Sequence, residues 1–464
     1  MVKVKTISRT TEDSVRKSKL DISKVHRNRA PELHPFERAR EYTKAVVATK
    51  LDKIFAKPFI GALDGHNDGV YCCSTVRSKN VPFISGACDG VIKVWDLSHR
   101  LCVWSTIAHT GFVRGICPDA QGNTFYSCGD DKTIKQWALD STLLKEEDEV
   151  DLELDRRGSN FTHTENIEPL KTIVSPETVS CMDHHWVDNQ FCTGGDTVQL
   201  WDSTRSAPVH TYKWGADAVQ SVKFNPAEAC LIGSTGVDRS VCLYDLRTSQ
   251  PMRKFLLSMR SNKIVWNPRE PFNFLLANED HNVYSFDMRK LDKALMIHKD
   301  HVSAVMDVSF SPTGREFVTG SYDRTLRLFK VGSGRSHEVY HTKRMQRIFC
   351  VNYSSDARFV LSGSDDTNVR IWKADPSSAL GVLSGRKERR QQVRDTIKKR
   401  YAHMPEIKRI SRDKRIPKSV KKASHIKHIQ NDSARRKQDN RVRHNDVDIE
   451  MAPERTKAVI AQLK

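Results

Sequence analysis

Residues 85–96 read SGACDGVIKVWD, and six later stretches repeat the pattern: SCGDDKTIKQWA (127–138), TGGDTVQLWD (193–202), STGVDRSVCLYD (234–245), LANEDHNVYSFD (276–287), TGSYDRTLRLFK (319–330) and SGSDDTNVRIWK (362–373). Each stretch carries an aromatic residue at a common position, and successive aromatics lie 42, 64, 43, 42, 43 and 43 residues apart. A period of about 40–45 residues is typical of a repeat unit of four short strands. The one long step indicates an insertion between the second and third units, not a missing unit.

Within each unit, a small residue begins one strand, an Asp follows in a tight turn, and the aromatic closes the next strand. The turn Asp can accept backbone N–H groups and orient a His from the preceding loop. The small hydroxyl and the indole N–H would complete a buried hydrogen-bond chain. The residues expected in these chains are His66, Ser85, Asp89, Trp95, His109, Ser127, Asp131, Trp137, His301, Thr319, Asp323, Ser362, Asp366 and Trp372.

This pattern resembles the WD-repeat family, and the resemblance is specific because it recurs seven times at one period. The predicted fold is all-β: a seven-bladed WD-repeat β-propeller. The segment 55–63, which precedes the first blade, is expected to supply the outer strand of the last blade and so close the ring. Units three, four and five lack a His in the usual loop and are expected to be less regular.

The repeated His, Asp and Ser sets could be mistaken for a catalytic triad. A catalytic site would occur once, whereas these sets recur, so we interpret them as structural and expect no enzyme activity. Cys181, His184, His185 and Cys192 lack the paired spacing of a metal site, and Gly332–Arg335 lacks the pattern of a phosphate-binding loop. The sequence therefore predicts no catalytic residue, no metal and no cofactor.

Charge divides the chain into three parts. The whole chain has a formal net charge of +19 and a pI of about 9.4. Residues 1–57 carry 15 basic and 7 acidic residues, residues 373–464 carry 26 and 11, and the part between them is left at −4. We therefore expect a basic N-terminal extension (1–57), a propeller (58–375) with an acidic surface insertion at about 140–170, and a basic C-terminal domain (376–464) that is mainly helical or extended.

The basic tail is the strongest candidate for a functional surface. Val393, Ile397 and Tyr401 recur at helical spacing, and a second helix is expected to begin near Pro417. Aromatic residues are scarce, so contact with phosphate is a better model than base stacking; the alternative is a nuclear-import signal. The candidate RNA or ribonucleoprotein contacts are Arg389, Arg390, Arg394, Lys398, Lys399, Arg400, Lys408, Arg409, Lys414, Arg415, Lys418, Lys421, Lys422, Arg435, Arg436 and Lys437.

Membrane and secreted classes are not supported. No run of 18 or more apolar residues occurs, and the N-terminal stretch lacks an apolar core of the kind found in secretory signals. The 11 cysteines are scattered, which favours reduced thiols in the cytosol or nucleus. We expect neither a membrane nor a small-molecule substrate as a partner.

Motifs at both ends and at the first blades narrow the resemblance to the SOF family of WD-repeat proteins: Leu33–Glu37, Arg40–Tyr42, Ala48–Leu51, Phe55–Phe59, Leu63–His66, Gly111–Ile116, Leu380–Leu383, Ile407–Ile410, Pro417–Ser419 and Arg435–Lys437. The resemblance covers nearly the whole chain. It implies a nucleolar scaffold of the small-subunit processome that works with the box C/D small nucleolar ribonucleoprotein on pre-rRNA, toward 18S rRNA. The implied partners are processome proteins, pre-rRNA and that ribonucleoprotein.

The same resemblance implies an alternative function. Metazoan relatives are read as substrate receptors of cullin-four RING ubiquitin ligases that bind the ligase adaptor through WDxR-type motifs. Here Arg247 and Arg289 close similar motifs, Tyr244–Arg247 and Phe286–Arg289, in which the Trp is replaced. Trp201–Arg205 keeps the Trp but displaces the Arg by one position. An Arg after a blade Asp can equally form a plain salt bridge at the blade edge.

Overall fold

The computed structural model describes residues 36–139, 168–213, 218–248, 250–444 and 453–463. The chain divides into two compact units: residues 1–57 with 377–413, and residues 58–376 with 414–464. The basic C-terminal region 376–464, treated above as one domain, therefore contributes to both units. The acidic stretch expected at about 140–170 falls almost wholly outside the described residues.

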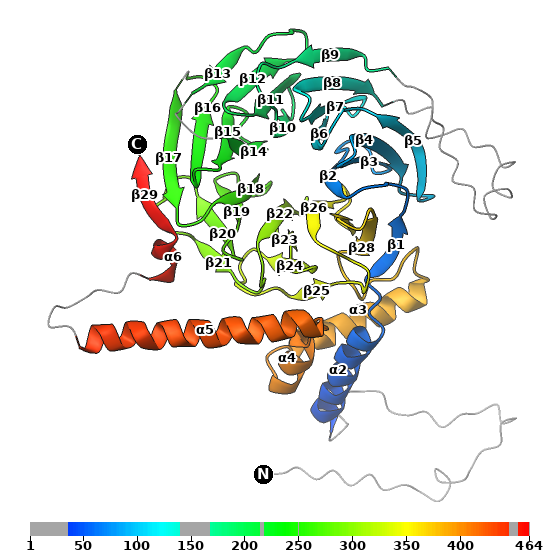
Figure 1. Ribbon diagram of the computed structural model, residues 1–464. Helices are drawn as coiled ribbons and strands as arrows, with labels where there is room; N and C mark the ends of the chain where they lie inside the picture. The colour runs from blue at the N-terminus through cyan, green and yellow to red at the C-terminus, as the bar shows by residue number, and fades with distance from the viewer. Residues whose placement is uncertain (1–35, 140–167, 214–217, 249, 445–452, 464) are drawn as a thin grey trace, which may run out of the picture. The chain divides into compact units, whose positions relative to one another are not determined.

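Seven antiparallel sheets form the blades of a β-propeller around a central axis, as the sequence predicts (Figure 1). In chain order the blades are β2–β5 (Val70–Thr75, Pro82–Ala87, Val91–Asp96, Leu101–Ile107), β6–β9 (Val113–Pro118, Thr124–Gly129, Thr133–Ala138, Lys171–Val174), β10–β13 (Cys181–His184, Gln190–Gly194, Val198–Asp202, His210–Tyr212), β14–β17 (Val219–Phe224, Leu231–Gly236, Ser240–Asp245, Pro251–Leu257), β18–β21 (Ser261–Trp266, Asn273–Asn278, Val283–Asp287, Met296–His298), β22–β25 (Val305–Phe310, Glu316–Ser321, Leu326–Lys330, Glu338–Tyr340) and β26–β28 (Ile348–Tyr353, Phe359–Ser364, Val369–Lys373) with β1 (Phe59–Leu63).

The core lies between neighbouring blades. Strands such as β3 and β15 are buried along their whole length because both faces of the sheet are covered. The repeat aromatics are all buried, and most stack on a ring of their own blade, as Phe329 does on Phe317 with 5.2 Å between centroids. The aromatic recurs every 43 residues or so because each blade needs one large ring to fill the wedge beside it.

The N-terminal strand closes the ring, as expected from the sequence. β1 pairs antiparallel with β28, with Phe59 opposite Trp372 and Leu63 opposite Val369. The backbone N–H of Lys373 also donates to the carbonyl of Pro58 at 2.8 Å. The last blade thus combines one strand from the start of the propeller sequence with three from its end, which leaves no open edge at the join.

The long step in the repeat is an insertion inside the second blade. Its third strand, β8, ends at Ala138, and its fourth, β9, begins at Lys171. The two strands still pair in regular register from Thr133 opposite Val174 to Gln136 opposite Lys171. The extra residues therefore extend one connection and leave the blade complete.

One blade has a fifth strand that the repeat pattern did not indicate. After helix α5 (Lys418–Arg443) and the short helix α6 (Glu454–Lys457), the chain ends in β29 (Val459–Leu463). This strand pairs antiparallel with β17, and the N–H of Ser258 donates to the carbonyl of Ala458 at 2.9 Å. The C-terminal strand therefore covers the outer edge of the fourth blade (Figure 1).

The smaller unit is helical. Helix α2 (Glu37–Ile54) packs with α3 (Gly385–Arg400) and α4 (Pro405–Arg412) around a small apolar core of Ala45, Val46 and Ile407. Among the helices that the structure describes, none combines the length and apolar character needed to cross a membrane. The helical spacing in the tail is confirmed, although Val393 is exposed rather than packed.

Candidate interaction surfaces

A buried hydroxyl links two side chains in the first blade. The Oγ atom of Ser85 accepts the indole N–H of Trp95 at 2.7 Å and lies 2.6 Å from Nε2 of His66. All three side chains are buried. Burial lowers the pKa of His66 to about 3, so the ring is neutral at pH 7.

The second blade extends this arrangement by one residue. Nδ1 of His109 lies 3.0 Å from both carboxylate oxygens of Asp131, and Nε2 lies 2.8 Å from Oγ of Ser127. Ser127 in turn accepts the indole N–H of Trp137 at 2.9 Å. Because Nδ1 faces a carboxylate, the ring donates there and accepts at Nε2 from the serine hydroxyl. All four expected members are joined in this blade.

The sixth blade has the same geometry without a tryptophan. His301 lies 2.9 Å from Asp323 through Nδ1 and 2.6 Å from Oγ1 of Thr319 through Nε2. Burial would raise the pKa of Asp323, but His301, Arg327 and Thr325 outweigh it and hold the pKa far below its ordinary value. A permanently charged carboxylate therefore orients this histidine.

Two of the expected Asp residues do not join a histidine, which corrects the sequence interpretation. Asp89 accepts only the N–H of Val91 at 3.1 Å, and Nδ1 of His66 is buried without a partner in the described part of the chain. Asp366 pairs instead with Arg370. A turn Asp typically accepts the backbone N–H of the residue two positions later in the chain. It also binds a histidine only where the preceding loop brings one close.

The last and third blades show what the pattern missed. Ser362 accepts the indole N–H of Trp372 at 2.9 Å, as expected. Thr193 does the same for Trp201 at 2.8 Å, although it was not among the candidates. Its position at the start of the repeat stretch, eight residues before Trp201, was the available signal.

Some basic residues of the helical unit are exposed, and two others pair with helix α2. Arg389, Arg390, Arg394, Lys399, Lys408 and Arg409 are exposed. Lys398 is half-buried and pairs with Asp52 on α2 and, at 2.6 Å, with Asp395. Arg400, though exposed, binds both carboxylate oxygens of Glu41 on α2 at 2.9–3.0 Å. Lys398 and Arg400 thus hold α3 to α2, and this was missed because their partners lie about 350 residues away.

The remaining candidate RNA contacts lie on helix α5 and in the residues just before it. Lys418, Lys421, Lys422, Arg435, Arg436 and Lys437 are all exposed along it, and Arg415 is exposed just before it. The helix begins directly after Pro417, as the sequence predicts. Lys414 differs, because its ammonium group lies 3.3 Å from Asp300 and 2.9 Å from Oγ of Ser336. Lys414 therefore attaches the tail to the sixth blade.

The two arginines of the adaptor-like motifs lie on neighbouring blades and are exposed. The guanidinium group of Arg289 is bound by both carboxylate oxygens of Asp287 and lies over the ring of Phe272. The hydrogen bonds that Arg289 donates to Asp287 raise the pKa of the guanidinium group further. The backbone N–H of Arg247 donates to Asp245 at 3.0 Å. Arg289 is thus held in the plain blade-edge salt bridge, with its outer face free to meet a partner.

The histidines clustered in the third blade bond to backbone carbonyls, and the neighbouring cysteines are buried in strands. Nδ1 of His184 lies 2.7 Å from the carbonyl of His185, and Nε2 of His185 lies 3.2 Å from the carbonyl of Ala229. Cys181 and Cys192 are buried on β10 and β11. Burial raises the pKa of both thiols, which favours the protonated form.

Two family models match the chain. A model described as Sof1-like domain matches residues 374–459, and one described as WD domain, G-beta repeat matches 57–96, 100–138, 206–245, 292–330 and 337–373. Protein SOF1 of Saccharomyces cerevisiae is 44% identical over 471 aligned residues, which cover 99% of this chain and 94% of that protein. The chain belongs to the SOF family of WD-repeat proteins. In this SOF-family chain, the repeat model leaves out the three inner strands of blade three (β10–β12) and of blade five (β18–β20).

Other SOF-family relatives carry a different name. DDB1- and CUL4-associated factor 13 of Homo sapiens is 45% identical over 464 residues, with 100% of both chains covered. The protein of the same name in Xenopus laevis is 46% identical over 443 residues, which cover 96% of this chain and 95% of that protein. The similarity extends through the helical unit and the tail as well as the blades.

Proposed function

We propose that this SOF-family chain is a non-enzymatic scaffold of ribosome biogenesis. In this proposal it acts in the nucleolus, within the small-subunit processome, and is required for pre-rRNA processing toward 18S rRNA together with the box C/D small nucleolar ribonucleoprotein. The family membership supports the assignment to ribosome assembly. The exposed basic face of helix α5 is the observation that carries the RNA contact.

The charge of α5 is the physical basis for that contact. Over Lys418–Arg443 the helix has nine Lys and Arg against two Asp, and its only buried side chain is Val420. An exposed helix of this charge attracts phosphate by releasing counterions, so affinity depends steeply on salt. Since the helix contains no aromatic residue, it offers charge rather than stacking, and little base preference is expected.

The test is a salt titration of single-stranded RNA binding by the full-length protein and two triple variants. Arg435→Gln, Arg436→Gln and Lys437→Gln together remove three exposed charges from α5. Lys293→Gln, Lys343→Gln and Arg344→Gln remove three exposed charges from the propeller and serve as the matched control. With about 0.7 of log–log slope per phosphate contact, the α5 variant is expected to lose about 2 from the slope, and the control to keep it.

Equal slopes for the α5 variant and the wild-type protein would remove α5 from RNA binding and leave nuclear import as the role of its charge. In cells depleted of the endogenous protein, the α5 variant should accumulate precursors of 18S rRNA while the control variant restores processing. Normal processing with the α5 variant, despite weakened RNA binding in vitro, would contradict the role in ribosome assembly.

A second candidate function is that of substrate receptor for a cullin-four RING ubiquitin ligase. It is favoured by the names of the relatives and by the exposed Arg247 and Arg289. The double variant Arg247→Ala and Arg289→Ala should abolish binding to the ligase adaptor without changing the melting temperature. Processing of pre-rRNA should survive this double change. Loss of small-subunit production with adaptor binding intact would contradict both proposals.

A further inference from the structure

The propeller encloses a cavity of about 430 Å³ along its central axis, lined by the inner strands of all seven blades. Its charged lining residues are Arg77, Arg114, Lys223 and Lys263 against only Asp183 and Asp307. The lining thus carries a net charge of +2 inside a propeller region whose net charge is −4, and Arg114 also pairs with Asp130 beside the lining at 2.6 Å. An acidic ligand would be attracted to the channel and disfavoured elsewhere on the disc.

The two carboxylates of the channel are already engaged. Asp183 accepts from the ammonium group of Lys223 at 2.6 Å and from the N–H of Phe224 at 2.9 Å. Asp307 accepts from the backbone N–H groups of Val308 and Val351 at 2.9 and 2.8 Å. Both side chains therefore tie neighbouring inner strands together, and their oxygens have little capacity left.

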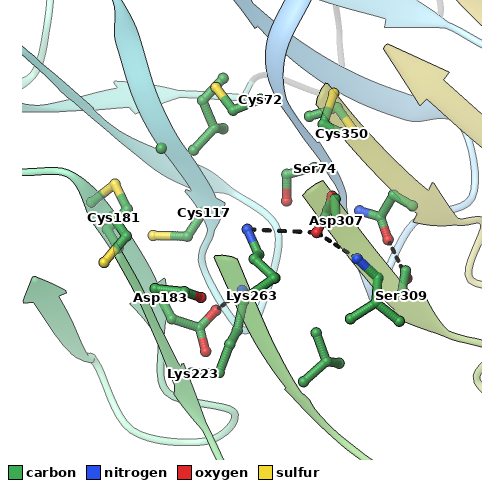
Figure 2. A pocket seen from close by; sticks show the side chains of 18 of the residues that line it. Cys72, Ser74, Cys117, Cys181, Asp183, Lys223, Lys263, Asp307, Ser309 and Cys350 are labelled. Carbon is green, nitrogen blue, oxygen red and sulfur yellow. Dashed lines mark hydrogen bonds and ion pairs between the residues drawn. The ribbon is translucent and has the colours of Figure 1, made fainter. Parts of the chain in front are cut away.

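Lys223 donates a hydrogen bond to a carboxylate of the channel, whereas Lys263 does not. Its ammonium nitrogen is 3.8 Å from the nearest oxygen of Asp307, beyond hydrogen-bond distance, and among the described residues it has no hydrogen-bond acceptor. Burial lowers the pKa of Lys263, but Asp307 together with Cys181, Tyr71 and Cys73 outweighs burial and raises it, so the group stays charged. Figure 2 shows this ammonium group in the open space of the pocket. Its donors face the lumen and are available to a ligand.

The same cavity has an apolar rim. Tyr71 and Phe349, from blades one and seven, lie with ring centroids 6.1 Å apart, and Phe349 also contacts Tyr322 at 6.1 Å. Arg114 lies over Tyr71, and Arg347 lies over Tyr322. The exposed Arg347 makes no ion pair with any described residue. Tyr71 and Phe349 line the cavity and offer contact area to aliphatic side chains, while Tyr322 and Arg347 lie beside the lining and add a positive charge.

We propose that the central channel binds an acidic, aliphatic linear segment of a partner protein, with a Glu or Asp carboxylate bound by Lys263 and flanking aliphatic side chains packed on Tyr71 and Phe349. The occupant is identified by charge complementarity: a carboxylate on an extended peptide satisfies Lys263, and alternating aliphatic residues match the rim. This site is separate from α5 and does not depend on the proposed RNA contact.

The test uses fluorescence polarisation with full-length protein and a labelled octapeptide that alternates Glu and Leu. An otherwise identical Gln and Leu peptide and a single-stranded RNA octamer are the comparison probes. The Glu peptide should bind about tenfold or more tightly than the Gln peptide. Lys263→Met should weaken Glu-peptide binding about tenfold or more, Lys263→Arg should keep most of it, and the exposed-site control Lys293→Met should not change it.

Melting temperatures separate a folding defect from a binding defect. If Lys263→Met unfolds the protein, Arg347→Ala at the exposed rim decides the matter and should weaken Glu-peptide binding about threefold or more. Equal binding of the Glu and Gln peptides, or unchanged binding in both variants, would overturn the proposal. Loss of RNA binding in Lys263→Met, with Glu-peptide binding intact, would overturn it too and assign the channel to RNA.

Discussion

In each of the four repeat stretches that contain tryptophan, one side-chain oxygen accepts the buried indole N–H. Trp95, Trp137, Trp201 and Trp372 donate to Ser85, Ser127, Thr193 and Ser362, respectively, at 2.7–2.9 Å. The oxygen satisfies an indole N–H that would otherwise be costly to bury. In some blades only, a histidine makes a second hydrogen bond to the same hydroxyl. The bond between the hydroxyl and the indole N–H is therefore the one that all four tryptophans share.

Replacing Trp95 by Ala should lower the free energy of unfolding by about 3–5 kcal/mol, because it removes a large buried side chain and leaves a cavity. Chemical denaturation measures the loss. The control is Trp186→Ala, since Trp186 is 36% exposed and outside the blade pairs. An unchanged unfolding midpoint in Trp95→Ala would show that the pair contributes nothing.

The neutral state of His66 predicts a pH dependence. Its pKa is about 3 when folded and about 6.5 when unfolded. The unfolded state therefore binds the proton more readily, and the contribution of His66 to stability is complete above pH 6.5 and declines as the pH falls below it. At pH 5 the loss is about 2 kcal/mol.

Denaturant titrations at pH 7 and pH 5, on wild-type protein and His66→Gln, measure this contribution. The variant cannot titrate at this position, so its loss of stability between the two pH values should be about 2 kcal/mol smaller than that of the wild type. The same pH dependence in both proteins would mean that His66 is protonated in the folded state.

At the scale of elements, local sequence patterns predicted the blades. Some elements whose partners lie far away in the sequence were not predicted. The recurring aromatic and turn Asp located two strands per blade, and the segment 55–63 before the first blade was expected to close the ring. β29 was not predicted, because Val459–Leu463 is a short run without periodicity whose partner β17 lies some 200 residues earlier. Helix α2 was treated only as part of a basic extension for a similar reason: its core partner Ile407 belongs to α4.

The strand β29 should protect the edge of the fourth blade. Ala461, which lies opposite Leu256, becomes a strand breaker when replaced by Pro. Ala461→Pro should increase hydrogen exchange in the β17 peptide 251–257 by roughly tenfold, and should leave β28 unaffected. Ile460→Ala changes an exposed side chain on the same strand and should leave exchange in β17 unchanged. Unaltered β17 exchange in Ala461→Pro would mean that β29 adds no protection.

For the molecule as a whole, stability depends on closing the ring. Ala62 lies opposite Arg370 in the closing pair. Ala62→Pro should lower the free energy of unfolding by about 2 kcal/mol or more and promote self-association through the open edge of β28. Thermal unfolding and light scattering measure the two effects. Ala62→Val keeps the N–H group and is the matched control; equal behaviour of both variants would show that the closure is not a stability determinant.

The pairing of β1 with β28 can form only late in translation. Phe59 leaves the ribosome 313 residues before its partner Trp372. At about 5–20 residues per second, β1 waits roughly 15–60 s for β28. During that time the growing protein is an open array of blades in which β1 has no strand to pair with. A partner or chaperone that shields this strand during translation would determine how many nascent chains mature, whatever the equilibrium stability of the finished ring.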